Sequence, residues 1–124
     1  MSKPPPEIAG RVKVMRDFAR DAAERGEHFF YIRIPESLGP VERGERYEEP
    51  LDDALSVDAL GRITGGGSQL GENNSIAYCG IDVVVSDRKR GLELIRRTMQ
   101  RLRAPREALI EEYVPTYREH PVYK

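Results

Sequence analysis

Apolar residues recur at helical spacing in the first part of the chain, and charged residues fill the positions between them. The apolar positions fall at i, i+4, i+7, i+11 and i+14, which is typical of one buried helix face. Pro6 suits the first turn, and Gly26 suits the C-terminal cap. The pattern predicts a helix over residues 6–26, after a Pro-rich start at residues 1–5 that we expect to be disordered. The apolar positions are Ile8, Val12, Met15, Ala19 and Ala22.

Four later segments have the character of β-strands. His28–Ile34 is rich in aromatic and β-branched residues and stops at Pro35. Ser75–Val85 alternates between two faces and is strongly apolar, and Ala108–Val114 is the last predicted strand. Gly61–Leu70 is an extended, glycine-rich segment that pairs with Ser75–Val85 across a turn at residues 71–74, so the two segments predict a β-hairpin.

Two further helices are predicted between the strands. One starts at Pro50, with acidic residues gathered at its positive end, and ends at Gly61. The other follows Ser86 as its N-cap and runs from Asp87 to about residue 102, before Pro105. Residues 35–49 contain prolines and glycines among alternating charges, which predicts a long loop. Residues 115–124 have two prolines and mixed polarity, so we expect a tail without regular structure.

After the first helix the order of elements is strand, helix, strand, strand, helix, strand, within residues 27–114 of a single domain that spans residues 1–124. This order resembles the split βαβ, or ferredoxin-like, arrangement. The resemblance implies an α+β fold with a four-stranded antiparallel sheet in the order 4-1-3-2, two helices on one face and the N-terminal helix added.

The two helices should cover the sheet face that bears Ile32 and Ile81. The opposite face is too apolar to lie wholly in water, so we expect the N-terminal helix or a second subunit to cover it. The residues of that face are Phe29, Tyr31, Ile76, Tyr78 and Val84.

The segment Gly65-Gly66-Gly67-Ser68 is the most unusual part of the strand pattern. Glycines inside a strand mark a bulge, a bend or a close approach. If Leu70 pairs with Ser75, Gly67 lies opposite Tyr78, whose ring could cover the glycines. The alternative is a ligand cradle, because exposed backbone amides favour anions. No P-loop or complete dinucleotide fingerprint is present. Packing is the favoured interpretation, with ligand contact as the alternative.

Arg33 and Asp82 should face the same side of the sheet on neighbouring central strands. An ion pair there would be partly buried beneath the N-terminal helix. It could hold a substrate carboxylate, although a structural role is the more common one. Tyr31 and Tyr78 lie on the strands where RNA-recognition motifs stack bases. The third strand lacks the basic, aromatic motif of those domains, so nucleic-acid binding is not expected.

The long predicted loop is the favoured functional surface. Long loops in small domains often carry function, and Arg43, Arg46 and Tyr47 have a composition suited to a protein contact. A plain solvated loop is the alternative.

The overall composition narrows the function classes. The chain has 20 basic and 21 acidic residues, for a formal net charge of −1, which predicts no electrostatic attraction to nucleic acid. Cys79 is the only cysteine, which suits a reducing compartment, and we expect it to be a small buried apolar residue. His28 and His120 are expected to be solvated. No apolar window approaches a membrane span and the N-terminus lacks a signal-peptide pattern, so a cytoplasmic location is expected.

No catalytic or metal-binding signature stands out, and no cofactor is expected. The sequence favours a non-enzymatic protein-binding or regulatory module, with an immunity-type or other inhibitor as one fitting role. Its partner would be another protein or a second copy in a homodimer. The alternative is a small-molecule-binding domain or minor enzyme with a pocket beside the glycines. The candidate ligand-binding or partner-binding residues are Tyr31, Arg33, Arg43, Arg46, Tyr47, Gly65, Gly66, Gly67, Ser68, Tyr78 and Asp82.

Overall fold

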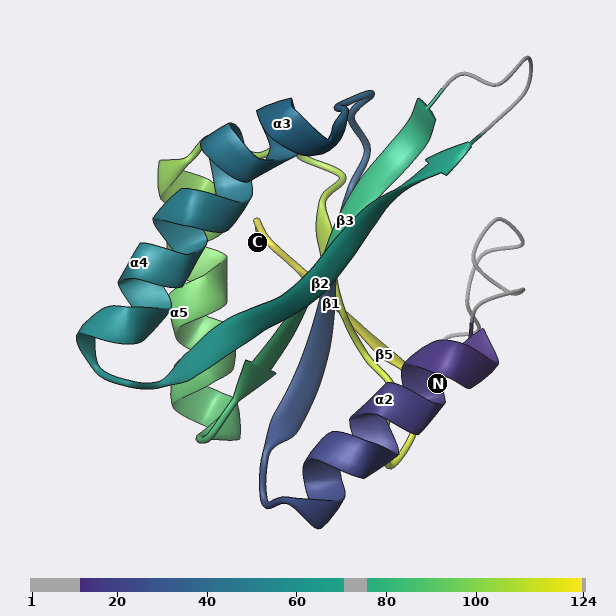
Figure 1. The fold of residues 1–124 in the computed structure, drawn as a ribbon, viewed down its shortest axis with the longest axis vertical. Coiled ribbons are helices and arrows are strands. Elements are labelled where there is room, and N and C mark those ends of the chain that lie inside the picture. The colour runs from purple at the N-terminus through teal and green to yellow at the C-terminus, as the bar shows by residue number, and fades with distance from the viewer. Residues whose placement is uncertain (1–11, 71–75, 124) are drawn as a thin grey trace.

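The computed structural model describes residues 12–70 and 76–123 of the chain. They form an α+β domain in which helices lie on both faces of an antiparallel sheet (Figure 1). The elements in chain order are α2 (Val12–Glu24), β1 (His28–Ile34), α3 (Pro40–Arg43), the π-helix η1 (Gly44–Glu48), α4 (Glu49–Val57), β2 (Gly61–Leu70), β3 (Ile76–Val85), α5 (Arg88–Arg101), β4 (Leu109–Glu112) and β5 (Arg118–Pro121).

The sheet has five strands in the order β2-β3-β1-β4-β5. Every neighbouring pair is antiparallel, and β1 lies between β3 and β4 in the interior of the sheet. The prediction of four strands is wrong, because part of the expected irregular tail forms β5. Leu109 pairs with Pro121 and Glu112 with Arg118. A proline is tolerated there because β5 is an edge strand.

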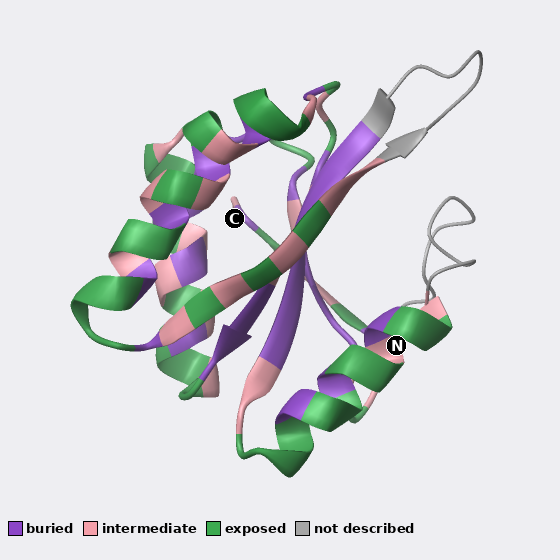
Figure 2. Cartoon of the chain, in the orientation of Figure 1, coloured by how far each residue is buried: buried purple, intermediate pink, exposed green. Residues whose placement is uncertain are grey.

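The larger core lies between the sheet and the helices α4 and α5. Ile32 and Ile81 are both fully buried in it, which confirms the prediction of the face that the helices cover. The buried residues concentrate along β1 and β3, while the edge strand β2 alternates between exposed and partly exposed positions (Figure 2). Gly91 on α5 allows the close packing of this helix, since a Cβ there would lie 2.5 Å from a methyl group of Val85.

A second, smaller core lies between the other sheet face and α2. Met15, Ala19 and Ala22 of the helix pack against the aromatic residues of that face. Tyr31 is 6% exposed and Tyr78 is 5% exposed within the single chain. Of the two expected covers, the N-terminal helix is therefore the one that buries these two tyrosines. Small alanine side chains let α2 approach closely, and Tyr113 and Tyr117 complete the cluster from the C-terminal side.

The segment predicted as a loop, residues 35–49, is largely helical. Pro40 stands at the start of α3, and the helical backbone continues through the π-helix η1 into α4. Buried side chains recur every four residues at Arg43, Tyr47, Leu51 and Leu55. This spacing is helical. Proline at a first helical position does not break a helix, which is why the loop prediction failed.

The helix ends use caps that differ partly from those predicted. Gly26 ends α2 with φ +76°, as predicted. Asp87 rather than Ser86 caps α5, since its side chain accepts from the Arg90 backbone N–H at 2.9 Å. The left-handed residue after α4 is Ala59, with φ +51°, and Gly61 instead begins β2.

Candidate functional site

The glycine segment lies in the edge strand β2, beside a register shift between Ile63 and Gly65. Gly65 pairs with Asp82 and Gly67 with Gly80, so the predicted register was wrong by two residues. A Cβ at Gly66 would lie 2.9 Å from Glu48 Oε2 and 2.9 Å from the Gly80 carbonyl oxygen, whereas one at Gly67 would meet nothing within 4 Å. The bulge and the space needed at Gly66 favour the packing interpretation.

The aromatic ring that fills space above a glycine is that of Tyr31, not Tyr78. Arg33 of β1 pairs with Gly80 of β3, and Tyr31, two residues before Arg33 on the same face of the sheet, extends its ring over Gly80. A Cβ at Gly80 would coincide with the Tyr31 ring and hydroxyl group. The prediction that Tyr78 covers the glycines of β2 is wrong, because Tyr78 lies opposite Gln69.

The predicted loop residues hold the helical segment onto β2. Arg43 is buried, and its Nε donates to Glu48 at 2.5 Å while Nη1 donates to the Ser68 hydroxyl at 3.2 Å. The Ser68 hydroxyl in turn donates to the Leu38 carbonyl at 3.0 Å. Arg43 and Ser68 thus come together as predicted site residues, but their contacts fix α3 to the sheet.

Tyr47 and Arg46 share one carboxylate. Tyr47 is fully buried and its hydroxyl donates to Glu36, which also accepts from Arg46 Nη1 at 3.0 Å. The Arg46 guanidinium lies 5.0 Å from the centre of the Tyr47 ring. Burial, then the bond to Glu36, raises the pKa of the Tyr47 hydroxyl far above its usual range. Tyr47 therefore stays neutral and cannot serve as an exposed contact.

Arg33 lies on the sheet face whose tyrosine Tyr31 is covered by α2, and Glu111 of β4 is an ion-pair partner on that face. Arg33 Nε is 3.5 Å from Glu111 Oε2, and the Glu111 side chain is fully buried. The Tyr113 hydroxyl donates to the other Glu111 oxygen at 2.5 Å. Asp82 lies opposite Tyr31 on the neighbouring strand, which places it diagonally across from Arg33 on the same face. Glu111 was missed, although alternation along the predicted last strand places it on the Arg33 face.

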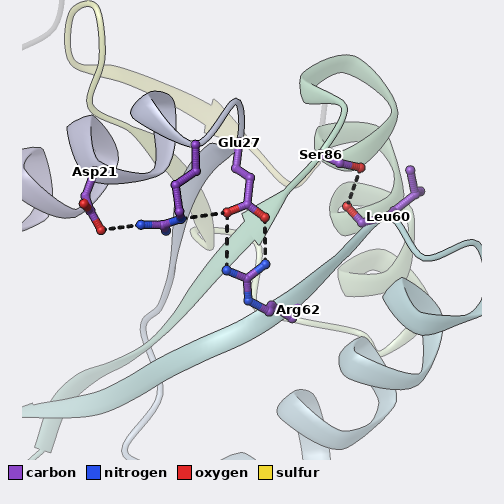
Figure 3. A network of polar contacts seen from close by, with 6 residues as sticks. Asp21, Glu27, Leu60, Arg62 and Ser86 are labelled. Atoms are coloured by element: carbon purple, nitrogen blue, oxygen red, sulfur yellow. Dashed lines mark hydrogen bonds and ion pairs between the residues drawn. The ribbon is translucent and has the colours of Figure 1, made fainter.

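Exposed ion pairs tie the end of α2 to the start of β2. Arg25 bonds to both Asp21 and Glu27, and Glu27 receives two bonds from Arg62 at 2.7 and 3.3 Å (Figure 3). The bonds from Arg62 lower the pKa of the Glu27 carboxyl. These pairs orient two elements, and their charges largely cancel.

A hollow of about 680 Å³ lies along α5, and none of the predicted site residues lines it. We call it the basic groove. Four cations line it, with one carboxylate, Glu93, near the middle. Leu92, Gln100 and Tyr123 complete the lining. The four cations are Arg88, Lys89, Arg96 and Arg97.

The C-terminal segment is fixed along α5 at this groove. Arg96 Nε donates to the Pro121 carbonyl at 3.1 Å, and Gln100 donates to the Val122 carbonyl at 2.7 Å. The Tyr123 hydroxyl donates to the Ala104 carbonyl at 2.5 Å. Among the described residues, Lys89 and Arg97 have no hydrogen bond or ion pair, so the groove presents unneutralised positive charge.

The buried carboxylate of Glu112 fixes the orientation of the Arg88 side chain. Arg88 gives that carboxylate two hydrogen bonds, and His120 Nε2 lies 2.9 Å from it. The His120 ring also makes an edge contact with Phe30, at 6.4 Å between centroids. The expectation of a solvated His120 is wrong, because β5 carries it back onto the first strand.

The signal for the groove was present in the sequence but hidden by the overall charge balance. Eight of the chain's 20 basic residues lie between positions 88 and 106, with one acidic residue among them. A local excess of this kind is what creates a surface potential. Only the fold shows that four of these cations line one hollow.

Cys79 is fully buried in the larger core, as predicted. Burial raises the pKa of its thiol to about 11, against the opposing influence of Arg43. The thiol is therefore protonated at neutral pH and acts as an apolar side chain. Within residues 12–70 and 76–123, no cluster of three or more His, Cys, Asp or Glu residues could hold a metal ion. No described helix is long and apolar enough to cross a membrane.

Comparison with known proteins finds no protein family, curated protein or solved structure that matches this chain.

Proposed function

We propose that the domain is a non-enzymatic binding module and that the basic groove is its contact surface for a partner protein. The observation that carries this proposal is the excess of cations in one hollow on a chain whose net charge is −1. Arginine is enriched at protein interfaces, where its planar donors suit carboxylates. A regulatory role, such as an inhibitor that covers an acidic site on a larger protein, would use this surface.

The groove is preferred over the earlier candidates because their polar groups already have partners inside the domain. Arg43 and Ser68 are engaged with each other, and Tyr47 is engaged with Glu36. Tyr31 and Tyr78 are covered by α2. Lys89 and Arg97 are exposed on the groove instead.

A small anionic molecule is the second candidate ligand. The volume of the groove lies within the usual range for ligand pockets, about 300–1,000 Å³. Such pockets are mostly apolar, however, whereas most of the residues lining this one are charged or polar. This composition favours a protein contact.

The proposed fold plan is ferredoxin-like with a fifth strand added. Two observations support it. Read from the β5 edge, the strand order is 5-4-1-3-2, which contains the expected order 4-1-3-2, and helices α4 and α5 pack on one face of the sheet. The plan itself carries little functional meaning, because it hosts many activities.

Affinity capture with a matched pair of variants tests the proposed function. The wild-type domain and the double variant Lys89→Glu/Arg97→Glu would serve as baits, and any candidate partner would be purified and titrated against both. We expect a saturable complex with the wild type that the double variant loses. Equal affinity of the purified partner for both baits would contradict the proposal. The double variant Arg20→Glu/Lys13→Glu, on the remote helix α2, controls for a change in total charge.

A further inference from the structure

We propose that the basic groove binds an extended acidic segment of the partner that carries two carboxylates four residues apart and an apolar residue midway between them. This inference rests on the proposed function and specifies the chemistry of the partner. It follows from the spacing of the cations along α5 and from the residues that lie between them.

The cations form two poles. Arg88 and Lys89 stand at the start of α5, and Arg96 and Arg97 stand eight residues later. A helix rises about 1.5 Å per residue, so the poles are about 12 Å apart along the axis. An extended chain advances about 3.3 Å per residue, so four residues span about 13 Å. Carboxylates at positions i and i+4 of an extended segment therefore match the two poles.

The middle of the groove selects against a third negative charge. Leu92 and Glu93 lie between the poles, and Tyr123 provides an aromatic surface from the C-terminal segment. In an extended segment the side chains at i, i+2 and i+4 project to the same face. The residue at i+2 thus faces Leu92, where an apolar side chain gains from burial and a carboxylate would be repelled by Glu93.

Hydrogen bonds inside the domain hold one arginine of each pole in place before a ligand binds. Glu112 holds Arg88, so the guanidinium loses little freedom when it meets a ligand. Arg96 donates from Nε to the Pro121 carbonyl, and no described hydrogen bond uses its two terminal nitrogens, so both can donate to a ligand. Lys89 and Arg97 supply the adjacent charges, and both side chains are exposed.

A nucleic acid fits this arrangement less well. Successive phosphates along one strand are about 3.4 Å apart along the duplex axis, so a strand crossing the groove would place phosphate next to Glu93. Among the described residues that line the groove, Tyr123 is the one aromatic side chain, whereas single-stranded nucleic acids are usually bound by several stacked rings.

Two charge-matched peptides test the inference with the intact domain. Both have seven residues and blocked ends, with leucine at position 4 in a glycine and serine background. The wide peptide has glutamate at positions 2 and 6, and the narrow peptide has glutamate at positions 3 and 5. Fluorescence anisotropy should show that the wide peptide binds about threefold to tenfold more tightly, since only it reaches both poles. Lys89→Gln and Arg97→Gln should each weaken the wide peptide and reduce this preference.

Arg101→Gln is the matched control, because Arg101 is exposed on the same helix and does not line the groove. It should leave both affinities unchanged. Equal affinities for the two peptides, or no binding of either at millimolar concentration, would overturn the inference. Tighter binding of a ten-residue oligothymidylate than of the wide peptide would overturn it in favour of nucleic acid. The proposed function would survive the first two results if the captured partner still required Lys89 and Arg97.

Discussion

Arg88 and Glu112 meet through two parallel hydrogen bonds, from Nε and Nη2 of the guanidinium to the two carboxylate oxygens at 2.6 and 2.7 Å. The pair joins the first turn of α5 to the end of β4, and His120 approaches the same carboxylate from β5. Burial favours the protonated acid, but the bonds from Arg88 and His120 outweigh it and hold the pKa of Glu112 at about 2. Three elements of the fold thus depend on one ionised carboxylate.

The Glu112 carboxylate should make the protein acid-sensitive. Its pKa falls from the ordinary value of 4.5 to about 2 on folding. The unfolded chain therefore takes up the proton first, so the stabilisation is complete above pH 4.5 and is lost as the pH falls towards 2. The change corresponds to on the order of 3 kcal/mol of unfolding free energy. Urea unfolding at pH 7, 4.5, 3 and 2 would measure it.

Glu112→Gln is the control for this acid dependence. The variant should be less stable than the wild type at pH 7, and its unfolding free energy should change less between pH 4.5 and 2. If both proteins lost the same free energy over that interval, the acid sensitivity would belong to other carboxylates.

Gly80→Ala should be strongly destabilising, because the new Cβ coincides with the buried Tyr31 ring. Overpacking a rigid core typically costs about 1–3 kcal/mol, and a ring that cannot move aside places this variant at the upper end. Gly67→Ala is the matched change in the paired strand, and it should stay within about 0.5 kcal/mol of the wild type because the added Cβ meets nothing within 4 Å. Thermal or urea unfolding would compare them. Similar midpoints for the two variants would show that the Tyr31 ring can rotate away.

Local patterns predicted much of this fold. The spacing of Met15, Ala19 and Ala22 predicted α2, and alternation predicted which faces of β1 and β3 point to the larger core. The elements missed were those in which local signals conflict. Pro40 and Gly44 are residues that usually interrupt a helix, although the buried positions Tyr47, Leu51 and Leu55 have helical spacing. β5 has little intrinsic strand character and is stabilised by pairing with β4, which no local pattern reports.

The candidate site was harder to predict than the fold. A second register shift, between Gln69 and Leu70, lies between the turn and the glycines, so a pairing counted from the turn could not be correct. The basic groove depends on the C-terminal segment folding back along α5. Net charge conceals it, because acidic residues elsewhere in the chain balance the cations of α5.

Ala59→Gly should stabilise the protein. Ala59 ends α4 in the left-handed region with φ +51°, and the Leu60 N–H donates back to the Leu55 carbonyl at 3.0 Å. That conformation is unfavourable by about 1 kcal/mol for a residue with a Cβ, and glycine removes this steric strain. Ser56→Gly, at an exposed position inside α4, should destabilise by about 0.5–1 kcal/mol. Differential scanning calorimetry would show opposite shifts of the midpoint, and a fall for both variants would contradict the helix-end assignment.

Arg33 and Glu111 should be energetically coupled. The Glu111 side chain is fully buried and that of Arg33 is 13% exposed, so removing either partner leaves a charge in a poorly solvated place. Arg33→Met and Glu111→Leu should each cost roughly 3–5 kcal/mol, whereas the double variant should cost less than the sum of the two. A double-mutant cycle by urea unfolding measures the coupling. A parallel cycle with Arg33→Met and Asp82→Asn tests the ion pair predicted from the sequence. Additive losses in the Arg33 and Glu111 cycle would mean that their contact at 3.5 Å contributes nothing to folding.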